Sequence, residues 1–244
     1  IKKIGLTALA GSLAATSAFA GALDVTGTAK ITYVSQDETE VTGNPFSMSQ
    51  GIGFSGSGDL DNGMTINYGY TMTDAAFSSS TLKLDMGDAG TLSYSDGAGS
   101  TGISAYDDKM PTAGEEVWDD LDGQANGVAT ISNKGTLGYD GSFAGIGVSI
   151  SYNPDDAASP ATTDGASKSI VLSADVAGAN VFVGVGDKAT AASNASTDLQ
   201  TMGVTYSNGA VTLGIQATVI DVTAASSDVD RLGAAISFAV NEEL

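Results

Sequence analysis

The chain contains no cysteine and no histidine among its 244 residues. Without cysteine it can form no disulfide framework and no thiolate-ligated zinc or iron–sulfur site. Without histidine it lacks the commonest metal ligand and the commonest general base at neutral pH. A conventional Ser–His–Asp triad is therefore excluded, and we expect a protein that is not an enzyme and has no cofactor.

Positive charge is also scarce. Nine Lys and Arg residues stand against 29 Asp and Glu residues, which gives a formal net charge of -20. Because binding to a nucleic acid backbone requires clustered basic side chains, no nucleic acid partner is expected.

The first twenty residues have the pattern of a secretory signal peptide. Lys2 and Lys3 form a basic start, residues 4–15 are mostly small and apolar, and Ala18-Phe19-Ala20 supplies an A-x-A cleavage pattern. The apolar run is shorter than the roughly 20 residues that a membrane-spanning helix needs. We therefore expect a signal peptide over residues 1–20 and an exported β domain over residues 21–244.

From residue 22 onward, apolar and polar residues alternate with a period of two. In GMTINYGYTMT, residues 63–73, Ile66, Tyr68 and Tyr70 belong to an apolar set, and threonine, asparagine and glycine fill the positions between them. Successive side chains of a strand point to opposite faces, so this pattern predicts strands with one apolar and one polar face. The twelve expected strands are 22–34, 47–59, 63–74, 78–86, 90–96, 133–140, 144–153, 167–177, 179–187, 198–207, 210–220 and 230–240.

The connections between these strands alternate in length. Tight turns are expected at 61–63, 87–90, 141–143, 177–178 and 208–209, where residues that accept positive φ are common. Longer connections are expected at 35–46, 97–132, 154–166, 188–197 and 221–229, and only the one near 74–77 is short. This alternation predicts an all-β, transmembrane, antiparallel up-and-down β-barrel with its short turns on the periplasmic side. A soluble β-sandwich or adhesin and a calcium-bound β-roll are alternatives, the roll because of the Gly- and Asp-rich segment GFSGSGDLDNG.

One acidic segment, AYDDKMPTAGEEVWDDLDG at residues 105–123, interrupts the alternation. It contains the only tryptophan, Trp118, and its only basic residue is Lys109. It falls between the fifth and sixth expected strands, in the third of the connections on the outer side. A wide barrel needs such a loop folded inside it to sieve small solutes, and charges at a constriction select by sign. The candidates for this acidic side are Asp107, Asp108, Glu115, Glu116, Asp119, Asp120 and Asp122.

Two other interpretations of the acidic segment stay open. In the first interpretation, the segment is a solvated external loop. In the second, its carboxylates bind a calcium ion, since hard cations take several oxygen ligands.

Four basic residues fall on the polar face of their expected strands. A Lys or Arg facing lipid would cost about 2–4 kcal/mol near the bilayer midplane, so placement toward the interior is favoured. We predict that they form a basic pore wall opposite the acidic segment. These residues are Lys30, Lys83, Lys134 and Arg231.

Five segments follow one another along the chain in a characteristic order and spacing: KKIGLTALAGSLAATSAFAG, FSGSGDLDNGMT, TLKLDMGDAGTLSY, PTAGEEVWDDLDG and VSISYNPDD. In their order and spacing the chain resembles the Gram-negative general porins, most closely the alphaproteobacterial kind, and the resemblance covers the whole chain. It implies a sixteen-stranded barrel, a constriction loop over residues 98–127 that folds into the lumen with its acids facing basic wall residues, and a homotrimer. Because the chain ends in FAVNEEL after the twelfth strand, without a terminal aromatic residue, we expect a fragment that lacks about four strands. A complete twelve-stranded barrel is the alternative.

The expected function is passive diffusion of small hydrophilic solutes and ions through a water-filled channel in the Gram-negative outer membrane, with a mild preference for cations. The expected partners are outer-membrane lipid, further copies of the chain and the diffusing solutes. An outer-membrane structural or adhesive barrel with a plugged lumen and a secreted acidic domain that binds calcium are the alternative functions.

Overall fold

The computed structural model describes residues 23–33, 46–74, 76–97, 101–112, 135–154, 166–190, 195–222 and 228–239. Within these ranges the fold is all-β, with twelve strands and two short 3₁₀ helices. The strands are β1 (Asp24–Tyr33), β2 (Phe46–Asp59), β3 (Thr65–Thr73), β4 (Ala76–Asp85), β5 (Thr91–Asp96), β6 (Thr136–Phe143), β7 (Ile146–Asn153), β8 (Ser167–Val176), β9 (Ala179–Thr190), β10 (Ala195–Asn208), β11 (Val211–Val222) and β12 (Val229–Phe238). The helices are η1 (Gly87–Ala89) and η2 (Gly102–Tyr106).

The strands form one sheet in which their spatial order follows their order in the sequence, from β1 to β12. The pairings are antiparallel throughout the registers that the structure describes. The all-β, antiparallel up-and-down prediction and its twelve strands are therefore confirmed. In the described part of the chain, no helix has the length and apolar character needed to cross a membrane.

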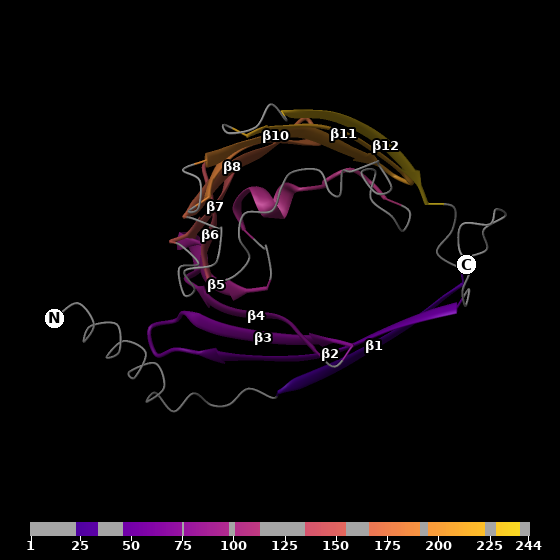
Figure 1. The fold of residues 1–244 in the computed structure, drawn as a ribbon. Helices are drawn as coiled ribbons and strands as arrows, with labels where there is room; N and C mark the ends of the chain where they lie inside the picture. Colours follow the sequence, from indigo (N-terminus) through magenta and orange to yellow (C-terminus); the bar gives the residue numbers. More distant parts are fainter. Residues whose placement is uncertain are drawn as a thin grey trace. The chain divides into compact units, whose positions relative to one another are not determined.

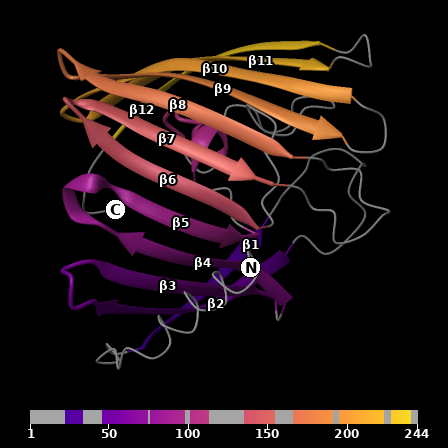
Figure 2. The ribbon, with the colours of Figure 1, turned by 90° about the vertical axis from the view of Figure 1, so that its left-hand side faces the viewer.

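The chain divides into two compact units, Ile1–Met86 and Gly87–Leu244. In the first unit the registers of β1–β4 keep the two alternating sets on separate faces. Ile52 lies opposite Met72, and Gly51 lies opposite Thr73. In the second unit, β5–β12 form a curved sheet with η2 on its concave side (Figures 1 and 2). We call this concave side the inner face of the second unit.

The two faces of the second unit differ in chemistry and in exposure. The convex face carries large apolar side chains open to the surroundings, among them Leu137, Ile150 and Val183, which are 51%, 38% and 50% exposed. The inner face carries small polar residues such as Ser149 and Thr201, which are buried. An exposed apolar face opposite a buried polar face is the reverse of a water-soluble sandwich, and it suits a sheet whose outer surface meets lipid.

Two predicted connections are wrong in position. The turn expected at Gly141–Phe143 lies at Ala144 and Gly145, which both have positive φ, as a two-residue hairpin turn often requires. Gly141 is instead a strand residue, and a Cβ there would collide with the ring of Tyr139. The long connection expected at 188–197 is shorter, because pairing continues until Thr190 lies opposite Ala195. Backbone pairing does not require apolar side chains, so the strands extend past the apolar stretch on which that prediction depended.

Candidate functional site

Residues 101–112, which we call the docked segment, lie against the inner face of the second unit. The docked segment begins with η2, whose first amide groups are satisfied by serine hydroxyls of the wall. The Gly102 amide donates to Ser149 Oγ at 2.8 Å, and the Ile103 amide donates to Ser169 Oγ at 2.8 Å. The hydroxyls of Ser151 and Ser169 also hydrogen-bond each other at 2.6 Å. Wall hydroxyls therefore take the place of water at the start of this helix, where amides have no partner within the helix.

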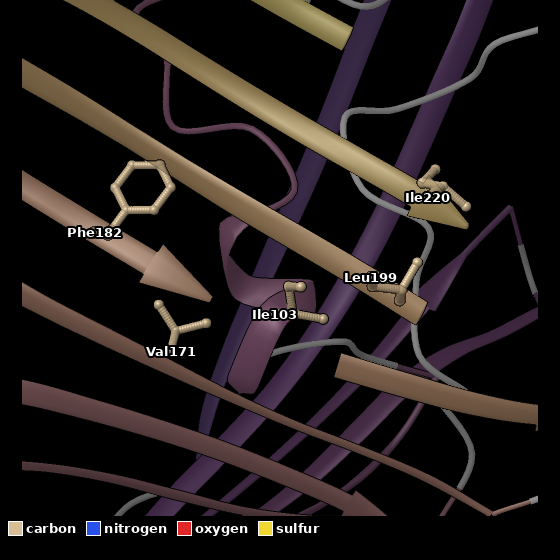
Figure 3. Close-up of a cluster of buried hydrophobic side chains, with 5 residues drawn as sticks. All are labelled: Ile103, Val171, Phe182, Leu199 and Ile220. Atoms are coloured by element: carbon tan, nitrogen blue, oxygen red, sulfur yellow. The ribbon is translucent and has the colours of Figure 1, made fainter. Parts of the chain in front are cut away.

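A small hydrophobic cluster holds η2 in place. Ile103 is fully buried, and Figure 3 shows it surrounded by apolar side chains from four strands of the sheet. The Tyr106 ring also packs on Phe182, with 5.1 Å between the ring centroids. The wall residues of this cluster are Val171, Phe182, Leu199 and Ile220, on β8, β9, β10 and β11.

The far part of the docked segment is clamped by Gln216 of β11, which is 1% exposed. Its Oε1 accepts a hydrogen bond from the Lys109 amide at 2.8 Å. Its Nε2 lies 2.8 and 3.0 Å from the carbonyl oxygens of Tyr106 and Asp107 and 3.0 Å from Thr201 Oγ1, and because it carries two hydrogens, one of them is shared between two of these acceptors. One buried amide thus satisfies three backbone groups that would otherwise be unpaired at the contact.

Glycines allow the docked segment to approach the wall closely. A Cβ at Gly214 would lie 2.6 Å from Pro111 Cδ and 3.1 Å from Met110 Cα. A Cβ at Gly138 would collide with the Thr101 side chain, and Gly102 itself has a φ of +61°. Any side chain at these glycines would push the segment away from the sheet.

The docked segment carries three charged residues. Asp107 Oδ1 accepts from the Asp108 amide at 2.8 Å, and Asp108 Oδ1 accepts from the Met110 amide at 2.7 Å. Both acids are half-buried, whereas Lys109 is exposed, with its Nζ 4.9 Å from the centroid of the Tyr106 ring. The carboxylates are therefore held by local backbone amides close to the wall.

Two of the seven predicted acidic residues, Asp107 and Asp108, thus lie on the docked segment. The other five lie outside the described residues, so their positions stay predictions; they are Glu115, Glu116, Asp119, Asp120 and Asp122. Within the described ranges no group of three or more acidic side chains could hold a metal ion, and the calcium hypothesis also stays a prediction.

The predicted basic residues are distributed over both units. Lys30 lies opposite Ser49, and Lys83 lies opposite Asn67, so both belong to the polar face of the first unit. Arg231 lies opposite Thr218 on the inner face of the second unit. Lys134 lies outside the described residues. The role of these four residues as a basic wall stays a prediction.

The sequence matches the Gram-negative porin family over residues 5–243, which is nearly the whole chain. The chain belongs to this porin family. It is accordingly a protein of the Gram-negative outer membrane and not an enzyme. The search of curated proteins gave no significant match.

Solved porin structures share the fold of this porin at low sequence identity. Salmonella typhi OmpF in complex with daunomycin is 15% identical, with a TM-score of 0.56, and the match covers 81% of this chain and 65% of that one. A loop-deletion mutant of OmpT from Vibrio cholerae is 12% identical, with a TM-score of 0.60 and coverage of 91% and 78%. An anion-selective porin from Comamonas acidovorans is 17% identical, with a TM-score of 0.55 and coverage of 88% and 73%. The chain thus spans about two thirds of the length of the Salmonella porin.

The sequence does not predict which wall residues hold the docked segment. Gln216, Ser149 and Ser169 resemble every other polar residue that alternates with the apolar set. A usable signal exists only for the hydrophobic cluster, because Phe182 and Leu199 are large apolar residues at positions of the polar set. Such misplaced apolar residues indicate that something packs on the polar face.

Proposed function

We propose that this porin forms a water-filled channel for passive diffusion of small hydrophilic solutes and ions across the outer membrane. The observation that carries the proposal is the docked segment, a part of a long strand connection that lies on the inner polar face and carries Asp107 and Asp108. A loop inside a barrel reduces an opening that would otherwise be too wide to discriminate between small solutes.

We further propose a mild preference for cations. The two acids on the docked segment and the net charge of -20 favour cations near the constriction. A porin described as anion-selective has a similar fold, so this proposal rests on the local charges of the chain and not on the fold.

The expected result of neutralising these acids is a weaker cation preference. A unit charge several ångströms from a solvated ion contributes on the order of 0.5–1 kcal/mol, so the double variant Asp107→Asn/Asp108→Asn should lower the cation-to-anion permeability ratio about two- to fivefold. The measurement is the reversal potential of single channels in a salt gradient. Asp61→Asn, in the exposed turn between β2 and β3, is the control and should leave the ratio unchanged. An equal effect of both variants would contradict a role for the docked segment in selectivity.

The proposed partners are outer-membrane lipid and two further copies of the chain in a homotrimer. The apolar face of the first unit has a hollow of about 530 Å³ near β1, β2 and β3, where small residues leave room for a neighbouring protein surface. Its lining includes Gly27, Ala29, Ile52 and Met72.

A lysine on the apolar face should destabilise the folded protein. Leu82 is 46% exposed on the apolar face of β4, and Ser55 is exposed on the polar face of β2. Leu82→Lys is expected to lower the free energy of unfolding in lipid vesicles by about 2–4 kcal/mol, whereas Ser55→Lys should change it by less than about 1 kcal/mol. Urea titrations of the vesicle-bound protein measure both values. Equal losses would contradict the assignment of the two faces.

A further inference from the structure

The polar face of the first unit is hollowed along β2, between β1 and β3. The hollow has a volume of about 280 Å³. Its floor is made by Gly51 and Gly53 of β2, and threonines of the two flanking strands form its sides. The register places Thr26, Gly53 and Thr71 in one row across the three strands, and Thr28, Gly51 and Thr73 in the next. We call this feature the threonine trough.

The glycines of the floor provide space and not a special backbone conformation. Neither Gly51 nor Gly53 has a positive φ, so the backbone conformation at both positions would accept other residues. A Cβ at Gly51 would lie 3.0 Å from Thr28 Oγ1, and a Cβ at Gly53 would lie 2.7 Å from Thr26 Oγ1. The hydroxyls of Thr26 and Thr28 thus lean over the floor, and even a methyl group at either glycine would occupy part of the trough.

The polar groups of the trough are available to a ligand. Lys30 lies at one end, next to Ser49 on β2, and both are exposed. Among the described residues Lys30 forms no ion pair. Within the same part of the chain, the four threonine hydroxyls have no hydrogen-bond partner. The ammonium group of Lys30 and the hydroxyls of the four threonines therefore line one hollow, and they stabilise no other part of the described fold.

We propose that the threonine trough is a weak binding site for small hydroxylated organic anions, that is, solutes that combine a carboxylate or phosphate with several hydroxyl groups. The ammonium of Lys30 pairs with the oxyanion, and threonine hydroxyls donate to and accept from the solute hydroxyls. Two strand spacings separate β1 from β3, roughly 9–10 Å, which admits one sugar-sized molecule over the glycine floor. This inference rests on the proposed channel function, which puts the polar face on the path of the solutes.

The test compares gluconate and glucose 6-phosphate with glucose as blockers of single-channel current. The two anions should reduce the current with a saturating concentration dependence, and glucose should bind about tenfold more weakly, since it lacks the charge-assisted hydrogen bond. Lys30→Gln should weaken the block by the anions about tenfold and leave the effect of glucose unchanged. Gly51→Ala/Gly53→Ala should weaken the effect of all three compounds, because the floor is filled.

The matched control is Gly56→Ala, on the opposite face of the same strand, where a Cβ would meet nothing within 4 Å. The Gly56→Ala variant should bind the three compounds as the unaltered protein does. Equal block of the unaltered protein and of the Lys30 and Gly51/Gly53 variants would overturn the threonine trough and leave the channel intact. Equilibrium binding of gluconate to the micelle-folded protein, followed by NMR, separates the two proposals. Absence of binding overturns the trough, whereas binding without any stepwise current supports the trough and contradicts the channel.

Discussion

Replacing Gln216 by leucine is expected to release the far part of the docked segment and to weaken the selectivity of the channel. The substitution removes three hydrogen bonds to the backbone of residues 106–109, which together stabilise the docked position by about 2–4 kcal/mol. The ratio of docked to released segment should fall by a factor of roughly 30 to 1,000. Single-channel recordings should show a higher conductance with more noise, and the reversal potential should move toward zero.

The control for this variant is Thr218→Val. Thr218 lies two residues further along β11, is 1% exposed, and its hydroxyl has no hydrogen-bond partner in the described part of the chain. Valine has nearly the same shape, so conductance and selectivity should stay those of the unaltered protein. If Gln216→Leu also leaves both quantities unchanged, the clamp has no part in the position of the segment.

Introducing a charge into the hydrophobic cluster should detach the other end of the docked segment. Ile103 is fully buried between η2 and the wall, and Ile103→Asp both removes that apolar burial and places a carboxylate among Phe182 and Leu199. We expect a loss of about 3–5 kcal/mol in the stability of the docked state, which exceeds the effect of losing single hydrogen bonds. Limited proteolysis should then cut the chain near residues 101–112, and the channel should conduct more.

Ile103→Val provides the comparison, since it keeps the apolar contact and should cost only about 0.5–1.5 kcal/mol. A protease pattern that is identical for the aspartate and valine variants would show that the cluster does not hold the segment.

The strands could be predicted from the sequence because each is specified by its own alternation. Ile146, Ile150 and Tyr152 share one face of β7 because they alternate with smaller or polar residues. Pairing with β6 is expected from a short turn, although that turn lies at residues 144–145 and not at 141–143. The ends of strands were less predictable. Thr190 and Ala195 extend β9 and β10 through backbone pairing alone, which leaves no mark in the hydropathy pattern.

The docking of the acidic connection could be predicted only in outline. Its length and charge indicate a loop with a role inside a barrel, but its contacts join residues that are far apart in the sequence. Gln216 is more than 100 residues from the carbonyl of Tyr106 that it binds. The sequence around neither residue predicts that contact. The role of the glutamine is evident only in the folded structure, where the curved sheet brings β11 against the segment.

The docked segment is proposed to line the path of the solutes, and the cysteine-free chain allows a direct test of this position. Lys109 is an exposed residue of the segment, and Lys109→Cys introduces a single thiol while keeping the backbone amide that Gln216 binds. Thiol reagents of similar size but opposite charge are then added during single-channel recording. We predict that each label lowers the current in one step, and that the negative and positive labels move the reversal potential in opposite directions. Complete labelling, verified by mass, with unchanged current and reversal potential would show that the docked segment does not line the path of the solutes.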